Sequence, residues 1–210
     1  MIEIIKHSWE DISINDYYML IEALKNDNEA EALIKIYAVL CNSDVDNIKK
    51  MPYKDFQTIT QIPVEWIYKP VTGKKKVKRC IKIHENEYLY NDKATKLTTA
   101  QFIDLQQIVS NNPNIEDLLA IILIPKGKKY GEYDIDDVKE EFKEYLDIET
   151  AKSLVNFLLA STNKSFRAIL TYLSYLIKKM SKKETGKQKE RLIEAQKQIK
   201  QLAQFSLGSI

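Results

Sequence analysis

The chain has 210 residues, of which 44% are hydrophobic and only 5 are glycine and 5 proline. This composition is sufficient for a buried core and argues against a disordered, collagen-like or loop-dominated protein. No apolar run is long enough to cross a bilayer, and no signal-peptide hydrophobic region follows the N-terminus. We therefore expect a folded protein without membrane partners, whose Cys41 and Cys80 are free thiols in a reducing compartment.

The net charge of +2 conceals an alternation along the chain. Residues 1–70 and 97–149 are acidic, with net charges of −5 and −7. Residues 71–96 and 150–210 are basic, with net charges of +5 and +9, so the four blocks add up to +2. Oppositely charged blocks of this kind favour contact with other copies of the chain or with another charged partner.

Residues 1–62 predict a first helical unit. Periodicity and turn residues predict a strand or extended arm at 2–5, followed by helices at about 14–25 and 29–41, a short helix ending before Pro52 and another at about 53–61. Ser13 and Asp16 form a predicted capping box at the start of the first helix.

Residues 63–92 predict a small antiparallel β-hairpin inserted after this unit. The segment 63–69 has the composition of a strand, 71–75 is expected to supply the turn at Gly73, and apolar residues alternate over 77–83 before a further strand near 88–90. A two-stranded ribbon is only marginally stable, so we expect it to pack on the helices or pair with another chain.

Residues 93–146 predict a second helical unit related to the first. The apolar pattern of residues 12–39 recurs at 97–124 with a constant offset and no gap, and Thr98 and Gln101 repeat the capping box. A further helix is expected to start at Asp134. A helix pair used twice suggests a scaffold that builds interfaces rather than a pocket for chemistry.

Residues 147–210 predict a C-terminal helical hairpin and a basic helical arm. Asp147 is expected to cap a helix over 148–160, and helices at 165–180 and 188–204 follow. The expected fold is therefore mainly α (α+β), with duplicated helical units flanking a small antiparallel β-hairpin.

The sequence contains no catalytic or metal-binding motif that would indicate an enzyme. Neither His7 nor His84 lies at metal-ligand spacing from a cysteine or a carboxylate cluster. Gly73 and the two lysines after it lack the remainder of a phosphate-binding loop, and the acids at 134–137 are better explained as a helix cap than as a calcium loop. We expect no catalytic residue, cofactor or metal.

Basic residues supply the candidate interface instead. They fall in two groups, and the second also contains the apolar stripe of the last predicted helix. The candidate residues are Lys74, Lys75, Lys76, Lys78, Arg79, Lys178, Lys179, Lys182, Lys183, Lys187, Arg191, Leu192, Ile199 and Leu202. Because aromatic residues lie near the first group, single-stranded nucleic acid is an alternative partner to an acidic protein surface.

Two stretches of sequence resemble phage proteins. The run from Trp9 to Tyr17, followed by an apolar helix and by the short segment 44–52, is similar to tail assembly chaperones of tailed phages. The layout that includes 97–105 and the Pro-Lys-Gly element at 123–127 looks like proteins from the structural gene clusters of crAss-like phages of Bacteroides. The resemblance implies a helical morphogenesis or virion protein with no catalytic residues to carry over.

These observations together predict a non-enzymatic virion protein of the tail, neck or portal region, present in the host cytoplasm during assembly. It would act as a homo-oligomer, closed into a ring by heterologous contacts, and dock on other phage structural proteins. The alternatives are a tail assembly chaperone absent from the mature particle, a cargo protein carried in the virion, and a nucleic-acid-binding module.

Overall fold

The computed structural model describes residues 3–90, 97–109 and 113–161. The chain divides into two compact units: residues 1–91 with 97–156, and residues 92–96 with 157–210. The predicted boundaries at 62 and 146 fall inside the first unit. The helices expected at 165–180 and 188–204 lie outside the described residues.

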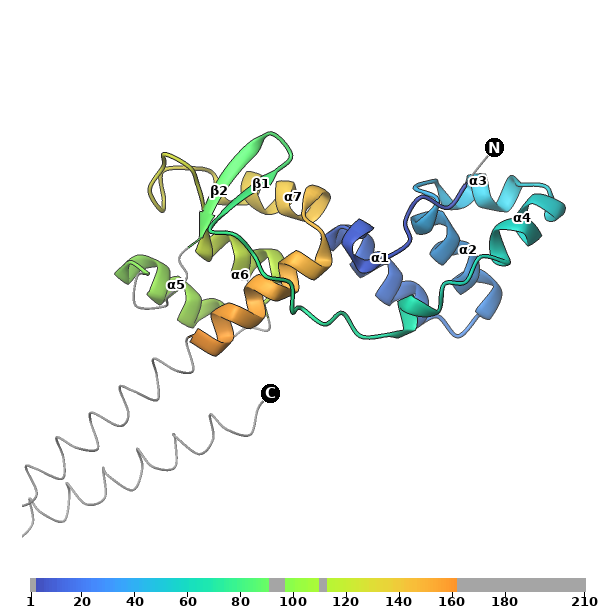
Figure 1. Ribbon diagram of the computed structural model, residues 1–210, viewed down its shortest axis with the longest axis horizontal. Coiled ribbons are helices and arrows are strands. Elements are labelled where there is room, and N and C mark those ends of the chain that lie inside the picture. The colour runs from blue at the N-terminus through green and yellow to red at the C-terminus, as the bar shows by residue number, and fades with distance from the viewer. Residues whose placement is uncertain (1–2, 91–96, 110–112, 162–210) are drawn as a thin grey trace, which may run out of the picture. The chain divides into compact units, whose positions relative to one another are not determined.

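The described part is mainly helical with a small antiparallel sheet, which confirms the predicted fold class (Figure 1). A 3-10 helix, η1 (Trp9–Asp11), precedes the first helix pair. That pair consists of α1 (Ile14–Leu24) and α2 (Glu29–Leu40), and two short helices follow, α3 (Val45–Lys50) and α4 (Tyr53–Thr60). All four helices lie where the sequence predicts them.

The N-terminal residues form the extended arm that was one of the two expectations for them. The backbone N–H groups of Ile5 and Lys6 both donate to the carbonyl oxygen of Leu40, at 3.0 and 3.2 Å. The arm therefore satisfies a carbonyl at the end of α2 that has no partner within the helix.

The second helix pair consists of α5 (Thr99–Val109) and α6 (Ile115–Ile122). Both predicted capping boxes are present: the Asp16 N–H donates to the Ser13 hydroxyl at 3.1 Å, and the Gln101 N–H donates to that of Thr98 at 3.2 Å. At the equivalent positions 20 and 105, and 36 and 121, the apolar side chains are buried in both pairs. The repeated pattern thus reflects a repeated core position.

The sheet contains β1 (Cys80–Ile83), β2 (Asn86–Tyr90) and β3 (Leu123–Pro125), in the order β1-β2-β3. The third strand comes from the end of the second repeat, where the apolar pattern had suggested continuing helix. Pairing with the free side of β2 ends α6 at Ile122 and places Leu89 opposite Ile124.

Two strand-level predictions are wrong. The segment expected as a strand at 63–69 contains the 3-10 helix η2 (Glu65–Tyr68), flanked by Pro63 and Pro70, which cannot donate to a ladder. The hairpin turn lies at 84–85 and not at Gly73, because β1 and β2 pair on either side of 84–85.

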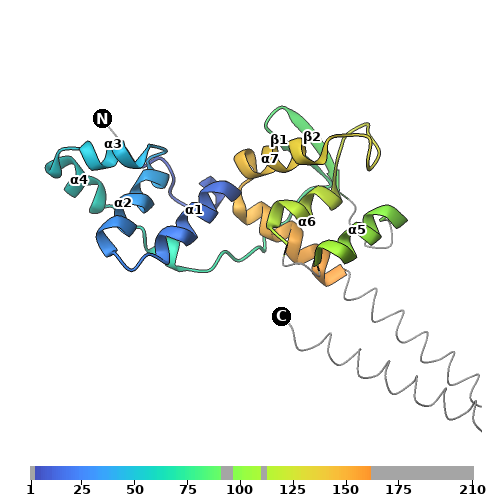
Figure 2. The same ribbon diagram turned by 180° about the vertical axis from the view of Figure 1, so that it is seen from behind.

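Helix α7 (Ile135–Tyr145) packs against one face of the sheet, where Phe142 meets Tyr88 with ring centroids 4.9 Å apart. Residues 148–161 are also helical, and an isolated bridge joins Ser13 to Asp147. Figure 2 shows α1 between α2 and α7, and α1 has contacts with both. The bridge between Ser13 and Asp147 ties the N-terminus of α1 directly to the N-terminus of the helix at 148–161. No local sequence pattern indicated this contact.

Candidate functional site

Residues 70–79, called the basic segment below, run without regular secondary structure from η2 to β1. The start of this segment is held by two tryptophans. The Trp9 Nε1 donates to the carbonyl oxygen of Lys69 at 3.2 Å, and the Trp9 and Trp66 rings meet edge to face at 5.0 Å. Trp9 thus acts as a structural anchor for the segment.

The middle of the basic segment is bound to the helix at 148–161 through its backbone and one short side chain. The Thr72 hydroxyl donates to Glu149 Oε1 at 2.6 Å, and the Lys75 N–H donates to the Ser153 hydroxyl at 2.9 Å. The Asn156 side chain donates to the carbonyl oxygen of Gly73 at 3.3 Å. These bonds fix the path of the chain while leaving its long side chains outside.

The sequence-predicted lysines therefore separate into two kinds. The Lys75 ammonium lies 3.7 Å from carboxylate oxygens of both Glu10 and Asp147, so part of its charge is used within the chain. Lys74, Lys76 and Lys78 are exposed, as is Arg79, which leads into β1. The other candidate residues, Lys178 to Leu202, lie outside the described part of the chain.

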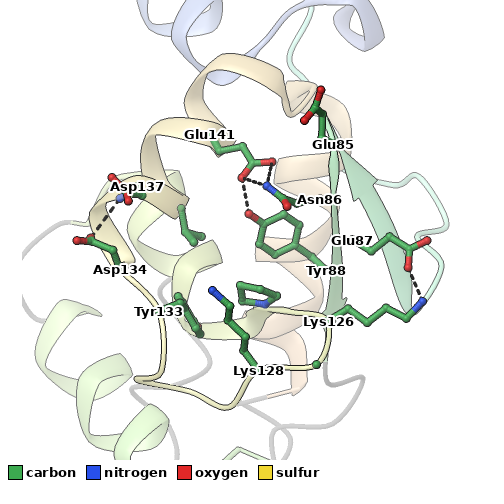
Figure 3. Close-up of a pocket in the computed structure, with 13 residues that line it drawn as sticks. Glu85, Asn86, Glu87, Tyr88, Lys126, Lys128, Tyr133, Asp134, Asp137 and Glu141 are labelled. Atoms are coloured by element: carbon green, nitrogen blue, oxygen red, sulfur yellow. Dashed lines mark hydrogen bonds and ion pairs between the residues drawn. The ribbon is translucent and has the colours of Figure 1, made fainter.

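A second charged surface is a cleft between the β1–β2 turn, the loop after β3 and the first half of α7 (Figure 3). Its lining includes five carboxylates and two lysines. We call this the acid-lined cleft; its charged residues are Glu85, Glu87, Asp134, Asp137, Glu141, Lys126 and Lys128.

Part of the acid-lined cleft is committed to internal contacts. Glu141 accepts hydrogen bonds from the Tyr88 hydroxyl at 2.5 Å and from the Asn86 amide at 3.0 Å, as Figure 3 shows. Burial, with the neighbouring Glu141, raises the pKa of the Tyr88 hydroxyl well above its ordinary value of 10.0. Lys126 pairs with Glu87 and lowers the pKa of that exposed carboxyl.

Other side chains at the rim remain available to a ligand. These are Glu85 and Asp137, which are exposed. Asp134, by contrast, accepts hydrogen bonds from the Asp136 and Asp137 N–H groups as the N-cap of α7. This is the capping role expected for the acids at 134–137. The net negative lining can attract a cationic group.

His84 stacks on Tyr145 with ring centroids 4.2 Å apart, and Cys41 and Cys80 are free thiols, as expected. Over residues 3–90, 97–109 and 113–161, no group of three or more histidine, cysteine or acidic side chains is arranged to hold a metal ion.

The acid-lined cleft was missed because net charge was summed along the sequence. Glu85 and Glu87 belong to the block with a net charge of +5, yet the β1–β2 hairpin carries them to the acids of α7. The signal that could have indicated this contact was the short hairpin, which lies between the basic segment and α7 in the sequence.

No protein-family model matches this chain, and neither a curated protein nor a solved structure matches it. In the portion of the chain that the structure describes, every helix is too short or too polar to span a membrane.

Proposed function

We propose that the chain is a non-enzymatic structural or assembly protein of a tailed phage, which acts through protein–protein contacts in an oligomeric assembly. In this proposal it belongs to the tail, neck or portal region of the virion and is present in the host cytoplasm during assembly. The phage assignment rests on the sequence resemblance, and the mode of action rests on the two charged surfaces.

The observation that carries the mode of action is the fixed basic segment. Its backbone bonds to Glu149, Ser153 and Asn156 hold it in one path, so binding does not have to order it first. Exposed lysines on a fixed support therefore form a preorganised cationic surface.

The acid-lined cleft on the same unit is the complementary surface. Contact between the basic segment of one copy and the acid-lined cleft of the next is heterologous, and such contacts build rings when the rotation between subunits closes. Because most of these charges are exposed, added salt screens the attraction beyond about 8 Å at physiological ionic strength.

Sedimentation velocity at low and high salt tests the assembly. We expect an oligomer at low salt that dissociates as salt is added, whereas a monomer at all salt concentrations contradicts the proposal. Mass spectrometry of purified particles tests the location: a virion part or cargo protein is present, and a tail assembly chaperone is absent.

Nucleic acid remains a second candidate partner because Tyr68, with 67% of its surface exposed, lies just before the basic segment. An exposed aromatic ring beside lysines suits base stacking and phosphate contact. Filter binding at several salt concentrations tests this candidate. If nucleic acid is the partner, the logarithm of the binding constant falls linearly with the logarithm of the salt concentration. This slope becomes shallower when Lys74, Lys76 and Lys78 are changed to glutamate.

A further inference from the structure

Strand β1 forms one edge of the sheet, since the strand order among the described residues is β1-β2-β3. The register pairs Cys80 with Leu89 and Lys82 with Glu87. Both Cys80 and Lys82 are exposed, while Ile83 is buried at 2% exposure. The face of the sheet that carries Cys80 and Lys82 is therefore exposed at this edge strand.

The hydrogen-bond pattern shows which backbone groups of β1 face the outer edge of the sheet. The Tyr90 N–H donates to the carbonyl oxygen of Arg79, which makes residues 79 and 90 a hydrogen-bonded pair. In an antiparallel ladder such pairs alternate along the strand, so residues 81 and 83 also bond to β2. The N–H and C=O groups of Cys80 and Lys82 consequently point away from β2.

These groups have no hydrogen-bond partner among the residues that the structure describes. An unpaired strand edge is a template for a further strand. The side chains around it decide which strand can pair there. Lys76 and Lys78, which precede β1, and Lys82 within it are all exposed and cationic.

We propose that the edge of β1 binds an extended acidic segment of a partner protein by strand addition. Backbone hydrogen bonds to Cys80 and Lys82 supply the pairing, and the lysines select for acidic side chains on the added strand. Basic strands are repelled, since like charges across a ladder are unfavourable. This includes the β1 edge of a second copy.

The inference extends the proposed function by naming a class of partner, and it holds whether or not the chain self-associates. The probe is a fluorescein-labelled octapeptide of alternating glutamate and valine, titrated into the full chain and followed by anisotropy. A peptide of the same sequence with every backbone amide N-methylated has the same charge and cannot donate to the ladder, and a lysine–valine peptide reverses the charge.

Two substitutions at one residue separate charge from pairing. Lys82→Ala removes the charge alone, and Lys82→Pro also removes the outward N–H without removing a bond to β2. We expect Lys82→Pro to bind the glutamate–valine peptide about fivefold more weakly than Lys82→Ala, the effect of one backbone hydrogen bond. Lys54→Glu, a charge reversal at an exposed position of α4, leaves binding unchanged.

Hydrogen exchange on the unmodified protein supplies a readout that does not depend on a variant folding. Strand addition protects the amides of Cys80 and Lys82 when the glutamate–valine peptide is added. Equal binding of the N-methylated peptide, or binding without new protection at these two amides, overturns the proposal. Absence of binding at low salt overturns it as well.

Discussion

Gly73 is a residue whose identity is explained directly by its tertiary contacts. It has a φ of +57°, and a Cβ at this position would lie 3.0 Å from the backbone carbon of Lys152 and against the Asn156 amide. The backbone can approach the helix at 148–161 only without a side chain there. Glycine is therefore explained by this close approach as well as by the positive φ.

Gly73→Ala should lower the free energy of unfolding by about 2 kcal/mol, since a positive φ and a close backbone contact are both penalised. Gly127→Ala is the matched control, because Gly127 also has a positive φ, +85°, but has nothing within 4 Å of its would-be Cβ. Urea unfolding measures both. Equal losses would show that the contact with the helix contributes nothing.

Half-buried tyrosines form a second group of informative residues. Burial raises the pKa of Tyr133 from 10.0 to about 12, and burial is also the largest cause of the raised pKa values of Tyr18, Tyr88 and Tyr130. Above pH 10 the unfolded chain loses these protons before the folded chain does. Stability is therefore complete below pH 10 and falls as pH rises beyond it.

Urea unfolding between pH 8 and pH 11 should show this decline. Tyr133→Phe should make the decline less steep, because one group with a raised pKa is removed. Tyr53→Phe, at a side chain that is 74% exposed, should leave the slope as it is. The account of the tyrosines fails if the decline is the same in all three proteins.

At the scale of elements, the two capping boxes show why the helices were predictable. A cap depends on residues three apart in the sequence, so the first turns of α1 and α5 were visible without tertiary information. Asp134 caps α7 and Asp147 caps the helix at 148–161. These caps were predictable for the same reason, since each depends on residues close together in the sequence.

Thr98→Ala should cost about 1 kcal/mol of stability because it removes the acceptor for the Gln101 N–H. Thr99→Ala, one residue later, makes the same chemical change inside the first turn and should have a much smaller effect. Thermal unfolding of the two variants distinguishes the loss of the helix cap from the general effect of replacing a threonine by alanine. A loss that is no greater for Thr98→Ala than for Thr99→Ala would contradict the capping role.

The strands were less predictable because their partners are distant. Residues 65–68 have β-branched and aromatic residues, yet Trp66 packs on Trp9, and the turn of η2 buries Ile67. Leu123–Pro125 continues an apolar helix pattern and becomes β3 only because β2 lies beside it. In both cases a tertiary contact outweighs the local preference.

At the scale of the whole molecule, the alternation of charge was visible in the sequence, but its spatial arrangement was not. Lys75 is partly neutralised by Glu10 and Asp147, whereas Glu85 and Glu87 join the acids of α7. Lys74, Lys76 and Lys78 are exposed, and their role as an interface stays a prediction. The attachment of the basic segment to the helix at 148–161 could be seen only in the structure.

Charge exchange between the basic segment and the acid-lined cleft tests the proposed assembly most directly. One variant changes Lys74, Lys76 and Lys78 to glutamate, and the other changes Glu85 and Asp137 to lysine; these substitutions avoid Asp134, which caps α7, and Glu141, which binds Tyr88. Sedimentation velocity at low salt should show monomers of each variant alone and a restored oligomer when the two are mixed. Oligomers of both separate variants, or monomers in the mixture, would contradict the account.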